Sequence, residues 1–251
     1  NDLIYQQYQN NNVVFVGYDK FKTPRYAGVR ATNSSRYMQD AYGSHKAFSF
    51  KLDSLDKNDS VHLFESAIDL LSYATLLKLD NKEWYNENLL SLAGVYQPAK
   101  KIDESKIPLA LNYYLNQNQN IKKIVLHFDN DSAGRIATMA LKTILPKQYE
   151  VVDDPPKVGK DFNDFLCDRV GINYKKRYGK EKKNYEKGLQ IKDERCIIRI
   201  EHYLVSIYIL KGRATYMNIY DISEKAGVSI ATVSRVLNNS PHVSQKTREK
   251  V

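Results

Sequence analysis

The sequence has little cysteine and no long apolar run, and each absence excludes a class of protein. Its two cysteines, Cys167 and Cys196, have no CxxC spacing, and the five histidines are scattered. We therefore expect neither a zinc module nor a disulfide framework, and we predict a reducing, cytoplasmic compartment. The most apolar late segment, residues 196–210, carries charges and is too short to span a bilayer. Because the polar N-terminus shows no signal peptide, no membrane association is expected.

The remaining composition is that of a globular protein with an uneven charge. The chain has 251 residues, 42% apolar and 27% charged, enough for one large or two small domains. Its first residue is Asn rather than Met, which predicts a fragment or a processed chain. The net charge is +4 over residues 1–52, −4 over 53–172 and +9 over 173–251. An acidic block can coordinate metal and basic flanks can hold phosphates, although solvated surfaces give the same totals.

The order of hydrophobic runs predicts four segments. Residues 1–55 form a small β-rich segment, with short β-branched or aromatic runs at 13–18, 25–31 and 47–52. Residues 56–172 alternate strands with helices, which predicts an α/β domain with a four-stranded parallel sheet. We expect strands at 61–64, 89–95, 122–128 and 149–153, and helices at 66–79, 107–117, 132–145 and 161–170. Residues 173–216 are a basic linker, and residues 217–251 a small helical unit.

Acidic side chains follow the ends of three predicted strands. Glu65 follows the first, Asp129 and Asp131 follow the third, and Asp161 comes after the fourth. Because the carboxyl ends of parallel strands share one edge of a sheet, we expect these acids to converge. Two carboxylates about 5 Å apart repel by roughly 3 kcal/mol at an effective dielectric near 20. A bound Mg²⁺ would turn this repulsion into a net attraction, since Mg²⁺ takes a few carboxylates as ligands and keeps several waters. The simpler alternative is that Asp131 only caps the following helix.

Three stretches together resemble the Toprim domain, the metal-binding module shared by bacterial-type primases, topoisomerases and some nucleases. They are LFESAIDLLS (63–72), LHFDNDSAGRIA (126–137) and GKDFNDFL (159–166). The preceding region, 13–52, is similar to the short segment before Toprim in proteins of plasmids and conjugative elements. Together these resemblances imply that residues 13–170, approximately, are those of a primase-like protein of a mobile element. The expected chemistry is metal-assisted phosphoryl transfer.

The Toprim resemblance also implies roles for individual residues. Glu65 would be the general acid or base or a metal ligand, and Asp129 and Asp131 would be catalytic and hold Mg²⁺ or Mn²⁺. Asp69 and Asp161 match further acidic positions and are expected as metal ligands. Asn163 departs from the acid usual at its position, which puts a second metal ion in doubt.

The last segment resembles the LacI-type helix-turn-helix headpiece, carried by AGVSIATVSRVLNNSP at 226–241. Gly227 fits the tight turn between two helices, and Ser229 fits the N-cap of the second. The resemblance implies that this unit binds double-stranded DNA. Base edges would be contacted by Ile230, Ala231 and Arg235, and phosphates by Tyr220, Ser229, Thr232 and Ser234. The hinge helix and sugar-binding domain of that family are absent from residues 217–251.

Two functions from different classes compete at this point. The first is a Mg²⁺-binding, primase-like nucleotidyl or phosphoryl transferase, or a degenerate relative, that acts on single-stranded or template DNA and carries a DNA-binding headpiece. Within it, nuclease and scaffold roles stay open. The alternative is a sequence-specific LacI-type transcriptional regulator whose N-terminal part is a non-catalytic passenger. Length favours the first and motif fidelity the second, while substrate, operator and oligomeric state stay undetermined.

Overall fold

The computed structural model describes residues 3–7, 10–32 and 37–172, and, near the C-terminus, 226–229, 232, 236 and 244–248. The chain divides into two compact units, Asn1–Leu210 and Lys211–Val251, which are considered separately. No helix within the described residues is both long enough and apolar enough to cross a membrane.

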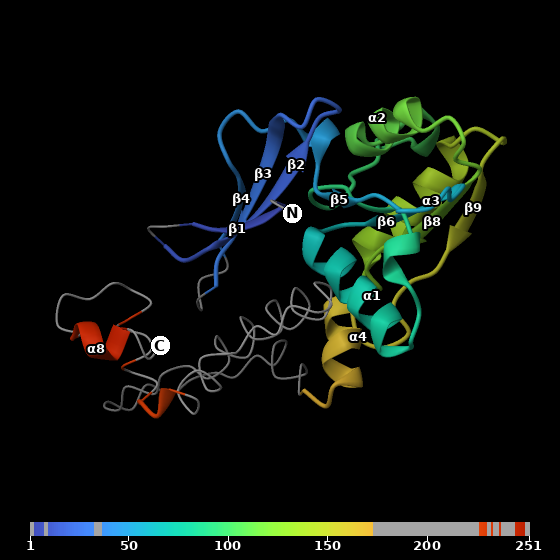
Figure 1. Ribbon diagram of the computed structural model, residues 1–251. Coiled ribbons are helices and arrows are strands. Elements are labelled where there is room, and N and C mark those ends of the chain that lie inside the picture. The colour runs from blue at the N-terminus through green and yellow to red at the C-terminus, as the bar shows by residue number, and fades with distance from the viewer. Residues whose placement is uncertain are drawn as a thin grey trace, which may run out of the picture. The chain divides into compact units, whose positions relative to one another are not determined.

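The first unit begins with a four-stranded antiparallel sheet in the order β1-β2-β3-β4 (Figure 1). Its strands are β1 (Ile4–Gln6), β2 (Val13–Tyr18), β3 (Pro24–Arg30) and β4 (Met38–Asp40). The two longer strands match the runs at 13–18 and 25–31, whereas β1 and β4 have no counterpart among the expected strands. With three residues each, the edge strands are too short to show an alternating pattern.

The run at 47–52, expected as a third strand of that sheet, is divided differently. Lys46–Phe48 form a 3-10 helix, and only Lys51–Leu52 form a strand, β5. β5 pairs with the second sheet rather than the first. The 3-10 turn lies so close to β2 that a Cβ on Gly17 would stand 1.7 Å from the carbonyl oxygen of Phe48. A glycine in β2 is therefore required for this approach.

The second sheet has five strands in the order β5-β7-β6-β8-β9. The four strands β6 (Ser60–Phe64), β7 (Leu89–Ser91), β8 (Lys123–His127) and β9 (Glu150–Asp153) are parallel, as predicted. β5 adds an antiparallel edge strand, which the sequence analysis did not predict. The central strands are buried on both faces, which explains their continuous apolar sequences.

Helices cover both faces of this sheet (Figure 1). α1 (Ala67–Leu79) and α4 (Phe162–Arg169) pack on one face, and α2 (Leu109–Gln117) and α3 (Ser132–Ile144) on the other. Burial of a side chain such as Phe64 or Leu126 contributes about 1.5–3 kcal/mol. Phe15 of β2 reaches the α1 and α4 core, where its ring lies 5.4 Å from that of Phe50. This contact joins the first sheet to the α/β layer.

In the second unit the described residues agree with a helix-turn-helix start. Gly227 has a φ of +63°, the left-handed conformation that glycine adopts at a tight turn. The hydroxyl oxygen of Ser229 accepts the backbone N–H of Thr232 at 3.2 Å, which is the predicted N-cap bond. A further short helix, α8, spans Gln245–Arg248.

Candidate functional site

The predicted convergence of carboxylates is present at the carboxyl end of the parallel strands. β6 and β8 are neighbours, with Phe64 opposite His127, so the residues that follow them lie side by side. The backbone N–H of Asp129 donates to Oε1 of Glu65 at 3.2 Å, across 64 positions of sequence. Glu65 thus faces the loop formed by Asp129, Asn130 and Asp131 (the DND loop) rather than pointing away from it.

Asp131 serves as a helix cap and as part of the acidic pair. Its Oδ1 accepts the N–H of Gly134 at 2.9 Å, which caps α3. Its other oxygen, Oδ2, lies 3.0 Å from Nζ of Lys160. The backbones approach each other closely at Gly134, where a Cβ would lie 2.2 Å from the carbonyl oxygen of Asp129. The two interpretations of the DND motif are therefore compatible.

A lysine that the sequence analysis missed lies between the two aspartates. Nζ of Lys160 is 2.9 Å from Oδ2 of Asp129 and 3.0 Å from Oδ2 of Asp131. Burial works to lower the pKa of Lys160, but hydrogen bonds to both carboxylates outweigh it and raise that pKa. Lys160 precedes Asp161 in the GKDFNDFL stretch, so the signal was in a motif examined only for its acids.

The loop that carries Lys160 is tied to the DND loop by its middle residue. The backbone N–H of Asn130 donates to the carbonyl of Lys160 at 2.7 Å, and its side-chain amide donates to the carbonyl of Pro156 at 2.7 Å. The fully buried Asp164 accepts the backbone N–H of Lys160 at 3.1 Å. These bonds fix the backbone position from which the lysine reaches the aspartates.

Asp69 and Asp161 lie near Glu65 and Asp129, and each stands at the start of a helix. Asp69 is buried in the first turn of α1, where Ser66 Oγ donates to its carboxylate. Asp161 caps α4 by accepting the N–H of Asp164 at 2.7 Å. Burial, followed by the nearby charges of Asp161 and Asp129, raises the pKa of Asp69 well above its ordinary value. The five predicted acids are thus electrostatically coupled.

Asn163, the neutral residue at a position where an acid is usual, lies in the first turn of α4. It is buried there, and its side-chain oxygen accepts from Sγ of Cys167 at 4.0 Å.

The surroundings of Glu65, Asp129 and Asp131 shift the pKa values of the three carboxyls in different directions. Burial and the charge of Asp129 raise the pKa of Glu65 to about 7. Burial also raises the pKa of Asp129, although Lys160 opposes it. The N–H of Gly134 holds the pKa of Asp131 below its ordinary value. A carboxyl that titrates near neutrality beside an ionised one is the arrangement that acid–base chemistry requires.

The donor set suits a hard divalent cation. Oxygens of Asp129 and Asp131 already converge on one positive charge, the Lys160 ammonium, and Glu65 is hydrogen-bonded to the same loop. Across the described residues, no group of three or more His, Cys, Asp or Glu side chains forms a ready-made metal cage. Mg²⁺ does not need one, because waters and substrate phosphates complete its shell.

The carboxylates open into a cavity of about 430 Å³ between the first sheet and the α/β layer. Arg30 of β3 and Lys46 line it together with Glu65, Asp129 and Lys160. Lys46 donates to the carbonyl of Ala93 at 2.9 Å, which holds it near this wall. Neither cation was predicted as a site residue, because their proximity to the acids depends on how the first sheet packs.

Among the predicted headpiece residues, Ser229 is exposed and Thr232 is half-buried. Their hydroxyl oxygens are 2.9 Å apart. Tyr220, Ile230, Ala231, Ser234 and Arg235 lie outside the described residues.

Comparison with known proteins agrees with the two resemblances. Residues 62–166 match the family model "Toprim-like", and residues 218–251 match "Bacterial regulatory proteins, lacI family". A transcriptional regulator of Lachnoclostridium phytofermentans is 74% identical over 35 residues, which are 14% of this chain and 10% of that protein. The lactose operon repressor of Escherichia coli is 63% identical over 35 residues, with the same coverage. The chain thus spans about a tenth of the length of these relatives.

Solved structures similar to the chain are primase domains. The primase fragment of the bacteriophage T7 primase-helicase has 18% identity and a TM-score of 0.43, covering 68% of this chain and 63% of its own. A primase domain from Pseudomonas aeruginosa has 13% identity and a TM-score of 0.43, covering 99% and 68%. The two family matches show that the chain carries a Toprim-like segment at 62–166 and a LacI-type helix-turn-helix segment at 218–251.

Proposed function

We propose that the chain is a nucleic-acid-processing protein whose Toprim-like domain binds Mg²⁺ or Mn²⁺ and catalyses primase-like nucleotidyl or phosphoryl transfer. The observation that carries this proposal is the meeting of Glu65, Asp129 and Asp131 at one edge of the sheet, around a position that already holds a positive charge. Such a group of buried acids is unfavourable unless a cation compensates it.

Asp129 and Asp131 would hold the ion, with Glu65 beside them and Asp69 and Asp161 behind. When bound, the ion supplies stabilisation of the attacking and leaving oxygens of phosphoryl transfer. Oε1 of Glu65 is occupied by the Asp129 N–H, so Oε2 is the atom left to accept or return a proton. With a pKa of about 7, Glu65 can do both near neutral pH.

The cations around the cavity provide the binding part of the reaction. Lys160 keeps the two aspartates oriented and presents its charge at the edge of the same cavity as Arg30 and Lys46. Three positive groups from separate segments suit a polyanionic substrate such as a nucleotide or a single strand of template DNA. Their charge offsets part of the negative charge of the carboxylates in the same cavity, where Lys46 also lies 3.6 Å from Asp40.

The headpiece supplies a second DNA-binding surface in this proposal. The LacI-family match at 218–251 supports binding to double-stranded DNA. Ile230, Ala231 and Arg235 would face base edges, with Arg235 as the polar reader of guanine. Tyr220, Ser229, Thr232 and Ser234 would contact phosphates. Without the rest of a repressor in residues 218–251, we expect weak half-site binding that is sensitive to salt.

The test is nucleotide incorporation and cleavage on single-stranded DNA by the full chain, with and without Mg²⁺. We expect Mg²⁺-dependent activity that Glu65→Gln reduces at least a hundredfold, because the proton acceptor is lost. Glu104→Gln is the matched control, since Glu104 is exposed and pairs only with Lys101 at 3.1 Å among the described residues. Absence of both activities, together with sequence-specific duplex binding, would support the regulator alternative instead.

Metal binding is tested separately by calorimetry. Mg²⁺ should bind the full chain and should bind much more weakly to the Asp129→Ala/Asp131→Ala variant. Equal and negligible heats for both proteins would contradict the metal site, whatever the activity assay shows.

A further inference from the structure

A second cavity, of about 440 Å³, lies at the opposite end of the parallel sheet from the carboxylates. Its wall includes Asn58, Asn88 and Ile121, which stand just before β6, β7 and β8 respectively. The acids follow β6 and β8 at their other ends. A five-residue strand spans about 16 Å, so the cavity is separate from the acidic site.

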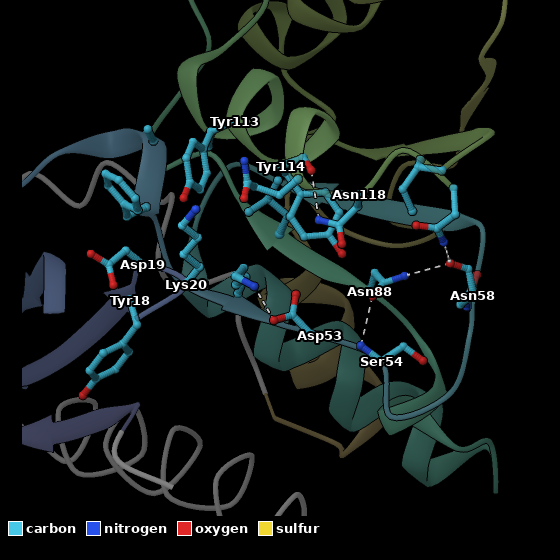
Figure 2. Close-up of a pocket in the computed structure, with 18 of the residues that line it drawn as sticks. Tyr18, Asp19, Lys20, Asp53, Ser54, Asn58, Asn88, Tyr113, Tyr114 and Asn118 are labelled. Atoms are coloured by element: carbon cyan, nitrogen blue, oxygen red, sulfur yellow. Dashed lines mark hydrogen bonds and ion pairs between the residues drawn. The ribbon is translucent and has the colours of Figure 1, made fainter. Parts of the chain in front are cut away.

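The side-chain amides of Asn58 and Asn88 are hydrogen-bonded within the protein. Oδ1 of Asn88 accepts the N–H of Ser54 at 3.0 Å, and its Nδ2 donates to the carbonyl of Ser60 at 2.9 Å. Oδ1 of Asn58 accepts the N–H of Ser60 at 2.8 Å, and its Nδ2 donates to the carbonyl of Asn86 at 2.7 Å. Figure 2 shows these side chains joining the segment after β5 to the start of β7. The wall is therefore preformed.

Aromatic rings line the side of the cavity under α2. The rings of Tyr113 and Phe48 lie 4.7 Å apart at an angle of 56°, and the guanidinium of Arg25 lies 4.9 Å from the Phe48 ring. Leu90 and Ala110 form a buried apolar floor. A flat ring that enters this space can stack on Tyr113, whose face is half-buried, while its edge stays near polar groups.

Polar groups at the rim are left without protein partners. Among the described residues, the Tyr113 hydroxyl, the Gln117 amide and the Lys57 ammonium take part in no hydrogen bond or ion pair. Two of the three carboxylates that line the cavity are already compensated, Asp19 by Arg25 at 3.4 Å and Asp53 by Lys51, whereas Asp56 forms no ion pair among the described residues. The rim thus offers neutral donors and acceptors together with a positive charge for an anion.

We propose that this cavity binds a nucleobase together with its attached phosphate, supplied either by a free nucleotide or by single-stranded nucleic acid. The base stacks on Tyr113, and its edge faces Gln117, four residues further along α2, and Asn118, the C-cap of that helix. The phosphate lies toward Lys57. The volume is that of small-molecule sites, and base stacking on aromatics tolerates any base.

The experiment measures binding to the full chain by calorimetry in EDTA, so that the acidic site carries no metal. The probes are ATP, a twelve-residue oligothymidylate and inorganic triphosphate. We expect ATP or the oligonucleotide to bind, and Tyr113→Ala to weaken that binding about five- to hundredfold. Tyr42→Ala is the control and should bind as the wild type does, since Tyr42 is fully exposed. Whichever of ATP and the oligothymidylate binds more tightly identifies the source of the base.

Three results would overturn the proposal. They are no binding of either base-containing probe at millimolar concentration, triphosphate binding as tightly as ATP, and binding that Asp129→Ala abolishes while Tyr113→Ala preserves it. Because Tyr113 also contacts Phe48, Gln117→Ala provides a second variant whose exposed side chain can be shortened without touching the core. It should weaken binding at least threefold, and unchanged binding in this folded variant contradicts the assignment of the base edge.

Discussion

The ammonium of Lys160 lies 2.9 Å from a carboxylate oxygen of Asp129, and the same ammonium contacts Asp131 at 3.0 Å. A side chain from the loop before α4 therefore occupies the position where the two aspartates direct their negative charge. The lysine both relieves repulsion between the carboxylates and competes with any divalent ion for the same oxygens. This dual role leads to opposite effects on stability and on metal binding.

We predict that Lys160→Met lowers the free energy of unfolding in EDTA by roughly 1 kcal/mol, because this ion pair is partly exposed and screened. The same change should tighten Mg²⁺ binding severalfold, since the competing charge is gone. Urea unfolding with and without Mg²⁺ measures both effects, with Lys101→Met as the control for loss of an exposed lysine. Weaker Mg²⁺ binding in Lys160→Met would show that the lysine supports the ion rather than competing with it.

Glu65 should impose a pH dependence on metal binding. Its pKa of about 7 means that the folded protein without metal holds a proton there below neutrality, and a ligand carboxylate must lose that proton. Mg²⁺ affinity should then rise by up to about tenfold per pH unit as the pH approaches 7, and level off above it. Calorimetry between pH 5.5 and 8.5 tests this, and Glu65→Gln should flatten the profile. A wild-type profile already flat from pH 5.5 would contradict the assignment.

Glu65 should also make the free energy of unfolding depend on pH. The folded-state pKa of Glu65 lies above its ordinary value, so folding favours the protonated form. Its contribution is present in full below about pH 4.3, the usual pKa of glutamate, and is lost as the pH rises through 7. In EDTA, therefore, wild type should lose more stability than Glu65→Gln between pH 5 and 8.

The fold was predictable where local sequence decides it. β6 and β8 are short apolar runs, each followed by a helix. Such runs are apolar because both faces of a parallel strand are buried, and this pattern predicted the sheet. The rule that function gathers at the carboxyl ends of such strands then predicted that Glu65 would meet Asp129. Both inferences need only the order of elements along the chain.

The unpredicted features depend on contacts between distant segments. β5 pairs with β7, whose first residue is Leu89, and no local pattern in Lys51–Leu52 specifies that partner. The position of Lys160 likewise depends on Asn130, whose backbone N–H donates to the lysine carbonyl. No role was predicted for Asn130 from the sequence, although its side-chain amide joins the two loops.

His127 is predicted to make stability fall in mild acid. Burial and the neighbouring His62 hold the pKa of His127 well below its ordinary value. Its Nδ1 lies 2.7 Å from the carbonyl of Asp154 and must donate, so its Nε2 accepts from Nδ1 of His62 at 2.8 Å. Because the folded-state pKa is lowered, the contribution is complete above about pH 6.5 and is lost as the pH falls below it.

The corresponding variant is His127→Phe, which keeps the volume but removes the titrating group. It should lose about 1–3 kcal/mol at pH 8, because the Asp154 carbonyl and His62 lose their partner. Its stability should then change less between pH 7 and 5 than that of the wild type. His45→Gln is the control, since His45 is exposed. Urea unfolding at each pH gives the comparison, and parallel pH curves for wild type and His127→Phe would argue against a buried neutral histidine.

We predict that Gly134→Ala destabilises the protein, although alanine has a higher helix propensity than glycine. In the first turn of a helix, Gly→Ala ordinarily stabilises by up to about 1 kcal/mol. Here the added methyl group would meet the carbonyl oxygen of Asp129 at 2.2 Å, so either α3 or the DND loop must move. We expect Gly134→Ala to destabilise the fold by about 2–3 kcal/mol and to weaken Mg²⁺ binding at least tenfold. Ala133→Ser, an exposed change in the same turn, should do neither. If Gly134→Ala raised the melting temperature, α3 would not approach Asp129 as closely as described, and the geometry of both aspartates would need revision.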